Sequence, residues 1–111
     1  MSAPQLQEAK ESVYDILELV RRRPPMYLDE RSISRLRSFL VGYQCGLGSH
    51  GLTFRADRPD FHSFHDWVAQ RLGFSSSTAG WCNMILKKST DEQDALDRFF
   101  ILLDEFRKES A

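Results

Sequence analysis

The amino-acid sequence predicts an all-α fold in one compact domain of about five helices. Apolar residues recur at helical spacing in several segments, and capping residues, prolines or glycines punctuate those segments. No run of period-two alternation is long enough to indicate a sheet. A chain of 111 residues has room for one hydrophobic core. We therefore expect a single helical domain over residues 1–111, in which residues 1–6 and 109–111 are flexible.

The first predicted helix covers about Gln7 to Arg22. Its apolar residues fall on one face at 3.6 residues per turn: Val13, Ile16, Leu17 and Val20. Pro24 and Pro25 are expected to end it, because proline lacks a backbone N–H and disfavours helical geometry in the residue before it. Residues 26–28 are then expected to be an apolar linker.

A second predicted helix begins after Ser32, a favourable N-cap, and ends at Gly46 and Gly48. Its inward face carries apolar residues at helical spacing: Ile33, Leu36, Phe39 or Leu40, and Tyr43. Residues 49–59 are expected to form a loop, in which residues 52–55 are a short extended piece.

Two shorter helices are predicted next. Asp60 is the expected N-cap of the third helix and Gly73 its C-terminal signal. Apolar and aromatic residues recur between them: Phe61, Phe64, Trp67, Val68 and Leu72. A fourth helix is expected around Gly80 to Lys88, with Trp81, Met84 and Ile85 on one side.

The last predicted helix is the clearest element. Thr90 and Gln93 have the spacing of a capping box at its start. A wide apolar stripe follows: Ala95, Leu96, Phe99, Phe100, Leu103 and Phe106. Since opposite ends of small helical domains often meet, we expect the first and last helices to pack together.

The net charge of −1 excludes a uniformly basic protein, but charge is segregated along the chain. Residues 1–20 carry one Lys against four acids, residues 21–71 nine Arg against five acids, and residues 72–111 five basic groups against seven acids. Such segregation is compatible with one acidic and one basic face, and either would steer a charged partner.

No apolar run approaches the ~20 residues needed to span a bilayer. The polar start of the chain also lacks the basic and then apolar regions of a signal peptide. We therefore expect a cytoplasmic protein with no membrane contact.

The cysteines and histidines do not indicate a cofactor. Cys45 and Cys82 have no CxxC spacing and are expected to be buried thiols. His62 and His65 lie three residues apart beside an aspartate, but zinc needs three or four ligands and the remaining histidine is in a predicted loop. We expect neither a metal nor another cofactor.

The most distinctive local string is RRRPPMYL, residues 21–28. It resembles the RPxMY segment near the start of the gyrase B ATPase domain. The chain lacks that domain's downstream Asn and Asp-rich helix and its glycine-rich lid, so ATP binding is rejected. One interpretation is a helix stop with solvated arginines and a buried Met-Tyr-Leu; the other is a contact with a phosphate or an acidic protein through Arg22, Arg23 and Tyr27.

Acidic residues gather at the start of the last helix, where the helix dipole favours them. They stabilise the helix, or they present carboxylates to a basic partner. The candidate partner-binding residues are Asp91, Glu92, Asp94, Arg22, Arg23 and Tyr27. No catalytic residue is predicted, because no nucleophile elbow or phosphate-binding loop occurs.

Four segments between Val13 and Lys108 share the pattern of a known family. They are VYDILELVRRRPPMYLDERSISRLRSFLVGY, DFHSFHDWVAQRLGF, STAGWCNMILKK and ALDRFFILLDEFRK. Together they resemble small bacterial all-helical immunity proteins of polymorphic and contact-dependent toxin systems. The resemblance implies a non-enzymatic protein that binds a cognate toxin domain and covers its active site or blocks its substrate. It assigns no site residues, because such proteins vary their contact surface with the toxin they meet.

The alternative is a small nucleic-acid-binding or regulatory module that uses the Arg-rich segment 21–37. The near-neutral net charge and the lack of a clear recognition helix oppose it, so nucleic acid is disfavoured as the partner.

Overall fold

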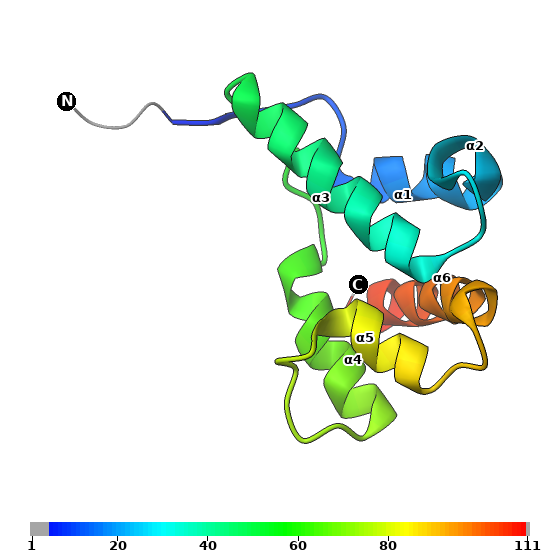
Figure 1. Ribbon diagram of the computed structural model, residues 1–111. Helices are drawn as coiled ribbons and strands as arrows, with labels where there is room; N and C mark the ends of the chain where they lie inside the picture. Colours follow the sequence, from blue (N-terminus) through cyan, green and yellow to red (C-terminus); the bar gives the residue numbers. More distant parts are fainter. Residues whose placement is uncertain (1–4, 111) are drawn as a thin grey trace.

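The computed structural model describes residues 5–110 as one helical domain (Figure 1). Within these residues there are six α-helices, five of them at least eight residues long, and the predicted all-α fold is confirmed. The flexibility expected for residues 1–6 and 109–111 falls in part on residues 1–4 and 111, which lie outside the described part of the chain.

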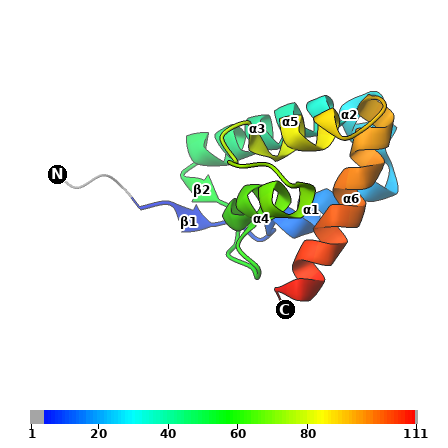
Figure 2. The same cartoon turned by 90° about the horizontal axis from the view of Figure 1, so that it is seen from below.

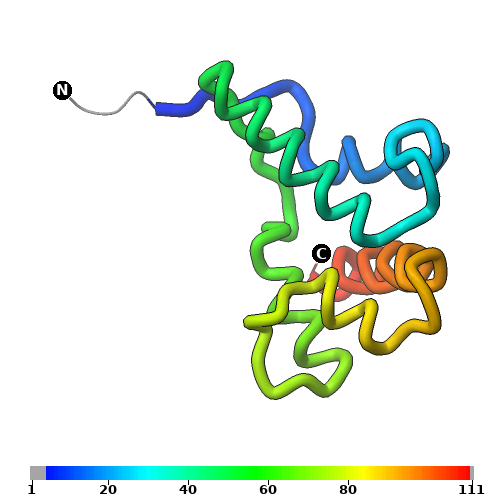
Figure 3. The backbone as a smooth tube through the Cα atoms, viewed as in Figure 1, coloured from blue at the N-terminus to red at the C-terminus, as the bar shows by residue number. Residues whose placement is uncertain are grey.

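The helices form two groups of three. They are α1 (Val13–Arg22), α2 (Pro24–Leu28), α3 (Ile33–Ser49), α4 (Phe64–Leu72), α5 (Gly80–Lys87) and α6 (Glu92–Glu109). In Figure 1, α1–α3 lie above α4–α6. Figure 3 shows the chain passing between the groups once, through residues 50–60. The core therefore lies between two helical layers that belong to successive halves of the chain.

Before α1, the chain is a strand and not the helix predicted from Gln7. Strand β1 (Gln7–Glu8) pairs in parallel with β2 (Leu52–Thr53), and both lie beside α3 in Figure 2. The N–H groups of Gln7 and Ala9 donate to the carbonyl oxygens of Gly51 and Thr53 at 2.9 and 2.7 Å. These bonds join segments that are distant in the sequence, so helical periodicity did not reveal them. The extended piece predicted at residues 52–55 is confirmed for the two residues of β2.

Helix α1 begins only after Ser12. The Ser12 hydroxyl accepts a hydrogen bond from the Asp15 N–H at 3.3 Å, and the Asp15 carboxylate accepts one from the Ser12 N–H at 2.9 Å. This reciprocal capping box fixes the start of the helix. At the other end, Arg23 leaves helical geometry with φ −142°, as expected before a proline.

The linker predicted at residues 26–28 is wrong, because the prolines start a helix as well as end one. Pro24 and Pro25 occupy the first positions of α2, where a backbone N–H has no helical partner to lose. Within α2, Leu28 is buried and Tyr27 is half-buried, whereas Met26 is exposed.

Helix α3 begins after Ser32 as predicted, with the Ser32 hydroxyl accepting from the Arg35 N–H at 3.2 Å. The predicted end at Gly46 and Gly48 is wrong, because both glycines remain helical. Glycine permits a left-handed turn without requiring one, and after the start of α3 the first positive φ is that of Gly51, at +72°.

The second half begins with a 3₁₀ turn, η1 (Phe61–Ser63), which leads into α4. Asp60 caps this turn by accepting from the His62 N–H at 3.0 Å. Gly73, with φ +81°, ends α4 as predicted. Helix α5 matches its predicted range to within one residue at its end.

The apolar stripe of α6 is buried as predicted, and it packs on the aromatic side chains of α4 and α5. The fully buried Phe64 ring lies 5.5 Å from the Phe99 ring and 5.2 Å from the Phe106 ring, centroid to centroid. Trp81 lies 4.8 Å from Phe99. Each buried aromatic contributes roughly 1.5–3 kcal/mol of apolar burial, so this cluster is the main source of stability in the lower layer.

The first and last helices, expected to pack together in the core, meet at its border, and α6 packs mainly on α3, α4 and α5. Two parallel hydrogen bonds join the Arg21 guanidinium to the Asp104 carboxylate, at 2.7 and 2.6 Å. The guanidinium carbon of Arg21 lies 5.3 Å from the centre of the Phe100 ring. The guanidinium carbon of Arg107 lies 4.2 Å from the centre of the Tyr14 ring. The amphipathic arginines therefore tie α1 and α6 together at the border of the core.

Candidate functional site

The acidic start of α6 caps helices. The Asp91 carboxylate accepts from the Asp94 N–H at 2.8 Å, and the Asp94 carboxylate accepts from the Thr90 N–H at 2.9 Å and from Arg98 Nε at 3.1 Å. The predicted capping box of Thr90 and Gln93 is therefore wrong, because the N-cap is Asp91 and the capping bonds go to the N–H groups of Asp94 and Thr90. Asp91 and Asp94 thus have structural partners within the chain.

Glu92 fastens the start of α3 to the start of α6. Its Oε1 accepts from the Ser32 hydroxyl at 2.7 Å and from the Ser34 N–H at 2.9 Å, and its Oε2 accepts from the Ser34 hydroxyl at 2.8 Å. Burial acts to raise the pKa of Glu92, but these hydrogen bonds outweigh it and lower the pKa. A carboxylate of one helix therefore caps the N-terminus of another.

The basic turn has few internal partners. The side chain of Arg22 is 73% exposed and its Nε lies 3.9 Å from Glu18, and Arg23 has no ionic partner within 4 Å among residues 5–110. Tyr27 is half-buried, with its ring edge-to-face to Phe39 at 6.0 Å. Of the predicted partner-binding residues, Arg22 and Arg23 are thus accessible, whereas Tyr27 packs against Phe39 with part of its side chain.

Two open hollows flank Ile101 on the solvent side of α6. The first, of about 390 Å³, has Leu72, Ile85 and Leu102 in its wall and Lys88, Asp94 and Arg98 around it. The second, of about 270 Å³, has Pro24, Leu96 and Phe100 in its wall and Arg21 and Arg31 around it. Asp97 and Ile101 border both hollows, and we call these two residues together with the hollows the α6 face.

Of the six predicted partner-binding residues, only Asp94 lines the α6 face. Asp94, from the acidic set, lines the first hollow, and Arg21 and Pro24, from the basic turn, line the second. Arg22, Arg23 and Tyr27 line neither hollow. The face carries both signs of charge around apolar walls, which is the general anatomy of a protein-binding surface.

Sequence reasoning missed Ile101, which is 58% exposed. A signal was available: Ile101 lies outside the buried stripe, in the row of α6 that otherwise carries Asp97, Asp104 and Glu105. Single exposed aliphatic residues are common on protein surfaces, and Leu19, Met26 and Val41 are exposed as well, so Ile101 is singled out by the two hollows beside it and not by its exposure alone.

The histidines pair with separate acids. His62 Nδ1 lies 3.0 Å from Asp60 Oδ1, and His65 Nε2 lies 3.7 Å from Asp66 Oδ1. In the described part of the chain, no three residues among His, Cys, Asp and Glu are placed to hold a metal ion.

Only one cysteine is buried. Cys82 is enclosed, with its Sγ 3.7 Å from the Ile33 carbonyl oxygen, and burial raises its pKa. Cys45 is exposed, so the prediction of two buried thiols is wrong for it. It falls on the half of α3 that extends beyond the core, where helical position alone does not ensure burial.

Among the described helices, none combines the length and apolarity needed to cross a bilayer. Comparison with family models, curated proteins and solved structures found no match to this chain.

Proposed function

We propose that this chain is an immunity protein that neutralises a cognate bacterial toxin by direct protein–protein binding, with the α6 face as its contact surface. The observation that carries the binding role is an exposed aliphatic side chain between two hollows surrounded by charge. The similarity of four segments to toxin-neutralising proteins supplies the class of partner. In this proposal the protein acts in the bacterial cytoplasm and needs no cofactor.

The α6 face has the means for both affinity and steering. A partner that covers Ile101 and fills the hollows removes apolar surface from water, and full burial of one such side chain contributes roughly 1.5–3 kcal/mol. Asp97 and Arg31 have no ionic partner within 4 Å in residues 5–110, so both remain available to complementary charges. Such charges mainly accelerate association, whereas the covered apolar centre slows dissociation.

The direct test is co-expression with toxin domains encoded beside the gene. We expect one such domain to stop growth alone, to be tolerated in the presence of this chain, and to copurify with it through an interface of about 1,200–2,000 Å². Growth arrest that persists against every neighbouring toxin, together with no copurification, would contradict the proposal.

A substitution locates the contact surface. Ile101→Asp is expected to weaken toxin binding by about 30-fold or more, because it places a charge at the covered centre. Val41→Asp is the matched control, since Val41 is 50% exposed on α3 and lies in neither hollow. Equal toxin affinities of the two variants, measured by surface plasmon resonance, would remove the α6 face from the proposal.

Nucleic-acid binding predicts a different result. Three arginines of segment 21–37 have ionic partners within 4 Å: Arg21 with Asp104, Arg22 with Glu18 at 3.9 Å, and Arg35 with Glu30 at 3.0 Å. Duplex binding whose affinity falls steeply with salt, without rescue from any toxin, would favour that module over an immunity protein.

A further inference from the structure

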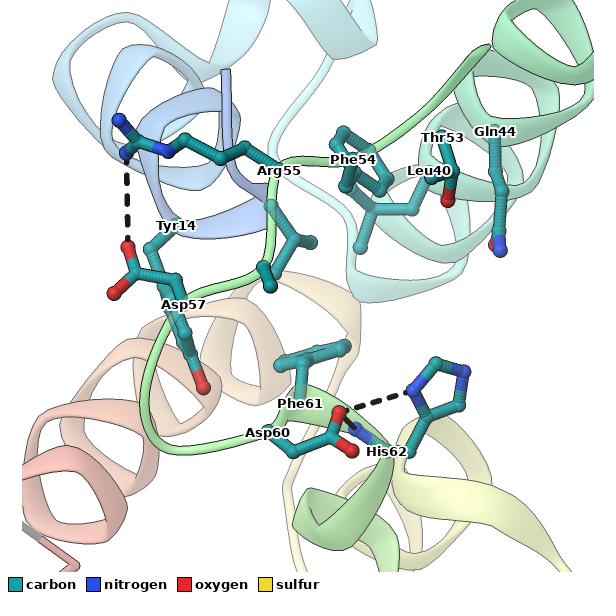
Figure 4. A pocket seen from close by; sticks show the side chains of 12 residues that line it. Tyr14, Leu40, Gln44, Thr53, Phe54, Arg55, Asp57, Asp60, Phe61 and His62 are labelled. Atoms are coloured by element: carbon teal, nitrogen blue, oxygen red, sulfur yellow. Dashed lines mark hydrogen bonds and ion pairs between the residues drawn. The ribbon is translucent and has the colours of Figure 1, made fainter. Parts of the chain in front are cut away.

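A separate cleft lies where the two helical layers are joined. It has a volume of about 420 Å³ and shares no lining residue with the α6 face. Figure 4 shows Leu40 and Phe54 on one side of it, and Phe61 and His62 across from them. Clefts of this size accommodate a small ligand or a partner's side chain.

Contacts between distant segments hold the walls in place. The Arg55 N–H donates to the Glu11 carbonyl oxygen at 2.9 Å, and the Tyr14 hydroxyl donates to the Pro59 carbonyl oxygen. Burial, opposed in part by Arg107, raises the pKa of Tyr14 to about 12, so this donor keeps its proton at neutral pH. The segment between Phe54 and Asp60 is therefore fastened to Glu11 and to Tyr14 of α1, and the cleft is largely formed before anything enters it.

The Asp60 side chain is 72% exposed, and one of its two oxygens has no partner within residues 5–110. Its Oδ1 takes both contacts from His62, the N–H and Nδ1, each at 3.0 Å, whereas its Oδ2 accepts no hydrogen bond from residues 5–110. The His62 N–H lowers the pKa of Asp60, so the carboxylate is ionised at neutral pH.

A second carboxylate adds to the negative charge of the lining. Asp57 Oδ1 accepts from the Arg58 N–H at 2.8 Å, and Asp57 Oδ2 lies 3.9 Å from Arg55 Nη2, beyond hydrogen-bonding distance. Arg55 lies closer to Asp15, at 3.2 Å, so its charge is divided between two carboxylates. The lining residues Arg55, Asp57 and Asp60 sum to a formal charge of −1.

We infer that this cleft binds the side chain of an arginine presented by a protein partner. The hydrocarbon stem would pack on Leu40 and Phe54, the planar guanidinium suits the aromatic Phe61, and Asp60 Oδ2 offers the acceptor that the guanidinium needs. Arginine fits better than lysine because its flat, weakly hydrated cation stacks on aromatic rings. This inference stands apart from the toxin proposal, since any protein that presents such an arginine meets the same chemistry.

The test uses N-acetyl-arginine methylamide as the probe and ¹H–¹⁵N NMR titration of the full chain as the measurement. N-acetyl-citrulline methylamide is the matched control, since it has nearly the same shape and no charge. The arginine probe is expected to shift amides of residues 53–62 and Leu40, with a dissociation constant on the order of millimolar for so small a ligand. The citrulline probe is expected to bind about fivefold or more weakly.

The variant Asp60→Asn assigns the acceptor. Asparagine is as good an N-cap as aspartate, so η1 should be retained while the charge is lost. We expect arginine binding to weaken about fivefold or more, whereas Asp29→Asn, at an exposed carboxylate elsewhere, should leave it unchanged.

Three results would overturn the inference: no shifts with the arginine probe, equal affinity for arginine and citrulline probes, or shifts centred on the α6 face. If Asp60→Asn failed to fold, the two probes on the parent chain would still decide the question. These outcomes involve no toxin, so they are distinct from failure of the immunity proposal.

Discussion

The start of α6 and the turn between α1 and α2 are both dense in charge, yet they use it differently. Asp91, Glu92 and Asp94 accept hydrogen bonds from helix N-termini, whereas Arg22 and Arg23 extend into solvent. The difference follows from chemistry, because carboxylates are acceptors and the first turn of a helix has unpaired N–H donors, while guanidinium groups only donate. Carboxylates at helix starts therefore commonly form hydrogen bonds within the chain, whereas basic clusters of similar density elsewhere remain available to a partner.

The largest expected effect concerns the core beneath both regions. Phe99→Ala is expected to lower the free energy of unfolding by about 3–5 kcal/mol and Ile16→Ala by about 2–5 kcal/mol, because each leaves a cavity among fully packed side chains. Chemical denaturation measures both values. Unchanged midpoints would contradict the packing of the two layers described above.

The comparison itself is tested by removing one charge from each region. Glu92→Ala should cost about 1–3 kcal/mol, since it leaves the Ser34 N–H and the Ser32 hydroxyl without their acceptor. Arg23→Ala should stay within about 0.5 kcal/mol of the parent. Equal costs in urea denaturation would mean that the two clusters do not differ in the way the contacts indicate.

The smallest expected effect is a pH dependence at the ion pair between α1 and α6. The hydrogen bonds from Arg21, as the largest cause, lower the pKa of Asp104 from its usual 3.8. Because the pKa of Asp104 is lower in the folded protein than in the unfolded chain, the ion pair stabilises the fold at pH values above the unfolded-state pKa. This stabilisation is lost as the pH falls through the folded-state pKa. Exposure of the pair limits it to roughly 0.2–1 kcal/mol. Parent and Asp104→Asn should therefore differ in stability at pH 6 and converge toward pH 2, and a constant difference would contradict this assignment.

Local sequence patterns were enough to predict helices whose apolar stripe, N-cap or stop signal is set by residues a few positions apart. The stripe of α6, the Ser32 cap and the stop at Gly73 all depend on residues a few positions apart. Contacts between distant segments were not predictable in this way: the β1–β2 pairing, and the hydrogen bond that the Ser34 N–H donates to Glu92, 58 residues away.

The candidate site shows the same limit. The charged residues were found as local clusters, but their availability depended on which N–H groups the fold brought near them. The exposure of Ile101 likewise depends on which side of α6 the other helices cover. Charge density in a sequence therefore locates polar surface, whereas the binding surface follows from tertiary packing.

The pairing of β1 with β2 has a consequence for local unfolding. The amides of Gln7, Ala9 and Arg55 form three successive bonds between residues 7–11 and 51–55, and the last of them holds the chain that continues into the wall of the cleft. Partial openings of a native protein occur in contiguous units. Detachment of the amino-terminal strand should therefore expose all three amides to hydrogen exchange together, and it should loosen residues 54–60 while the aromatic core of α4–α6 stays closed. Removal of residues 1–10 would take away the bonds of Gln7 and Ala9 and leave only the bond from the Arg55 N–H to the Glu11 carbonyl oxygen.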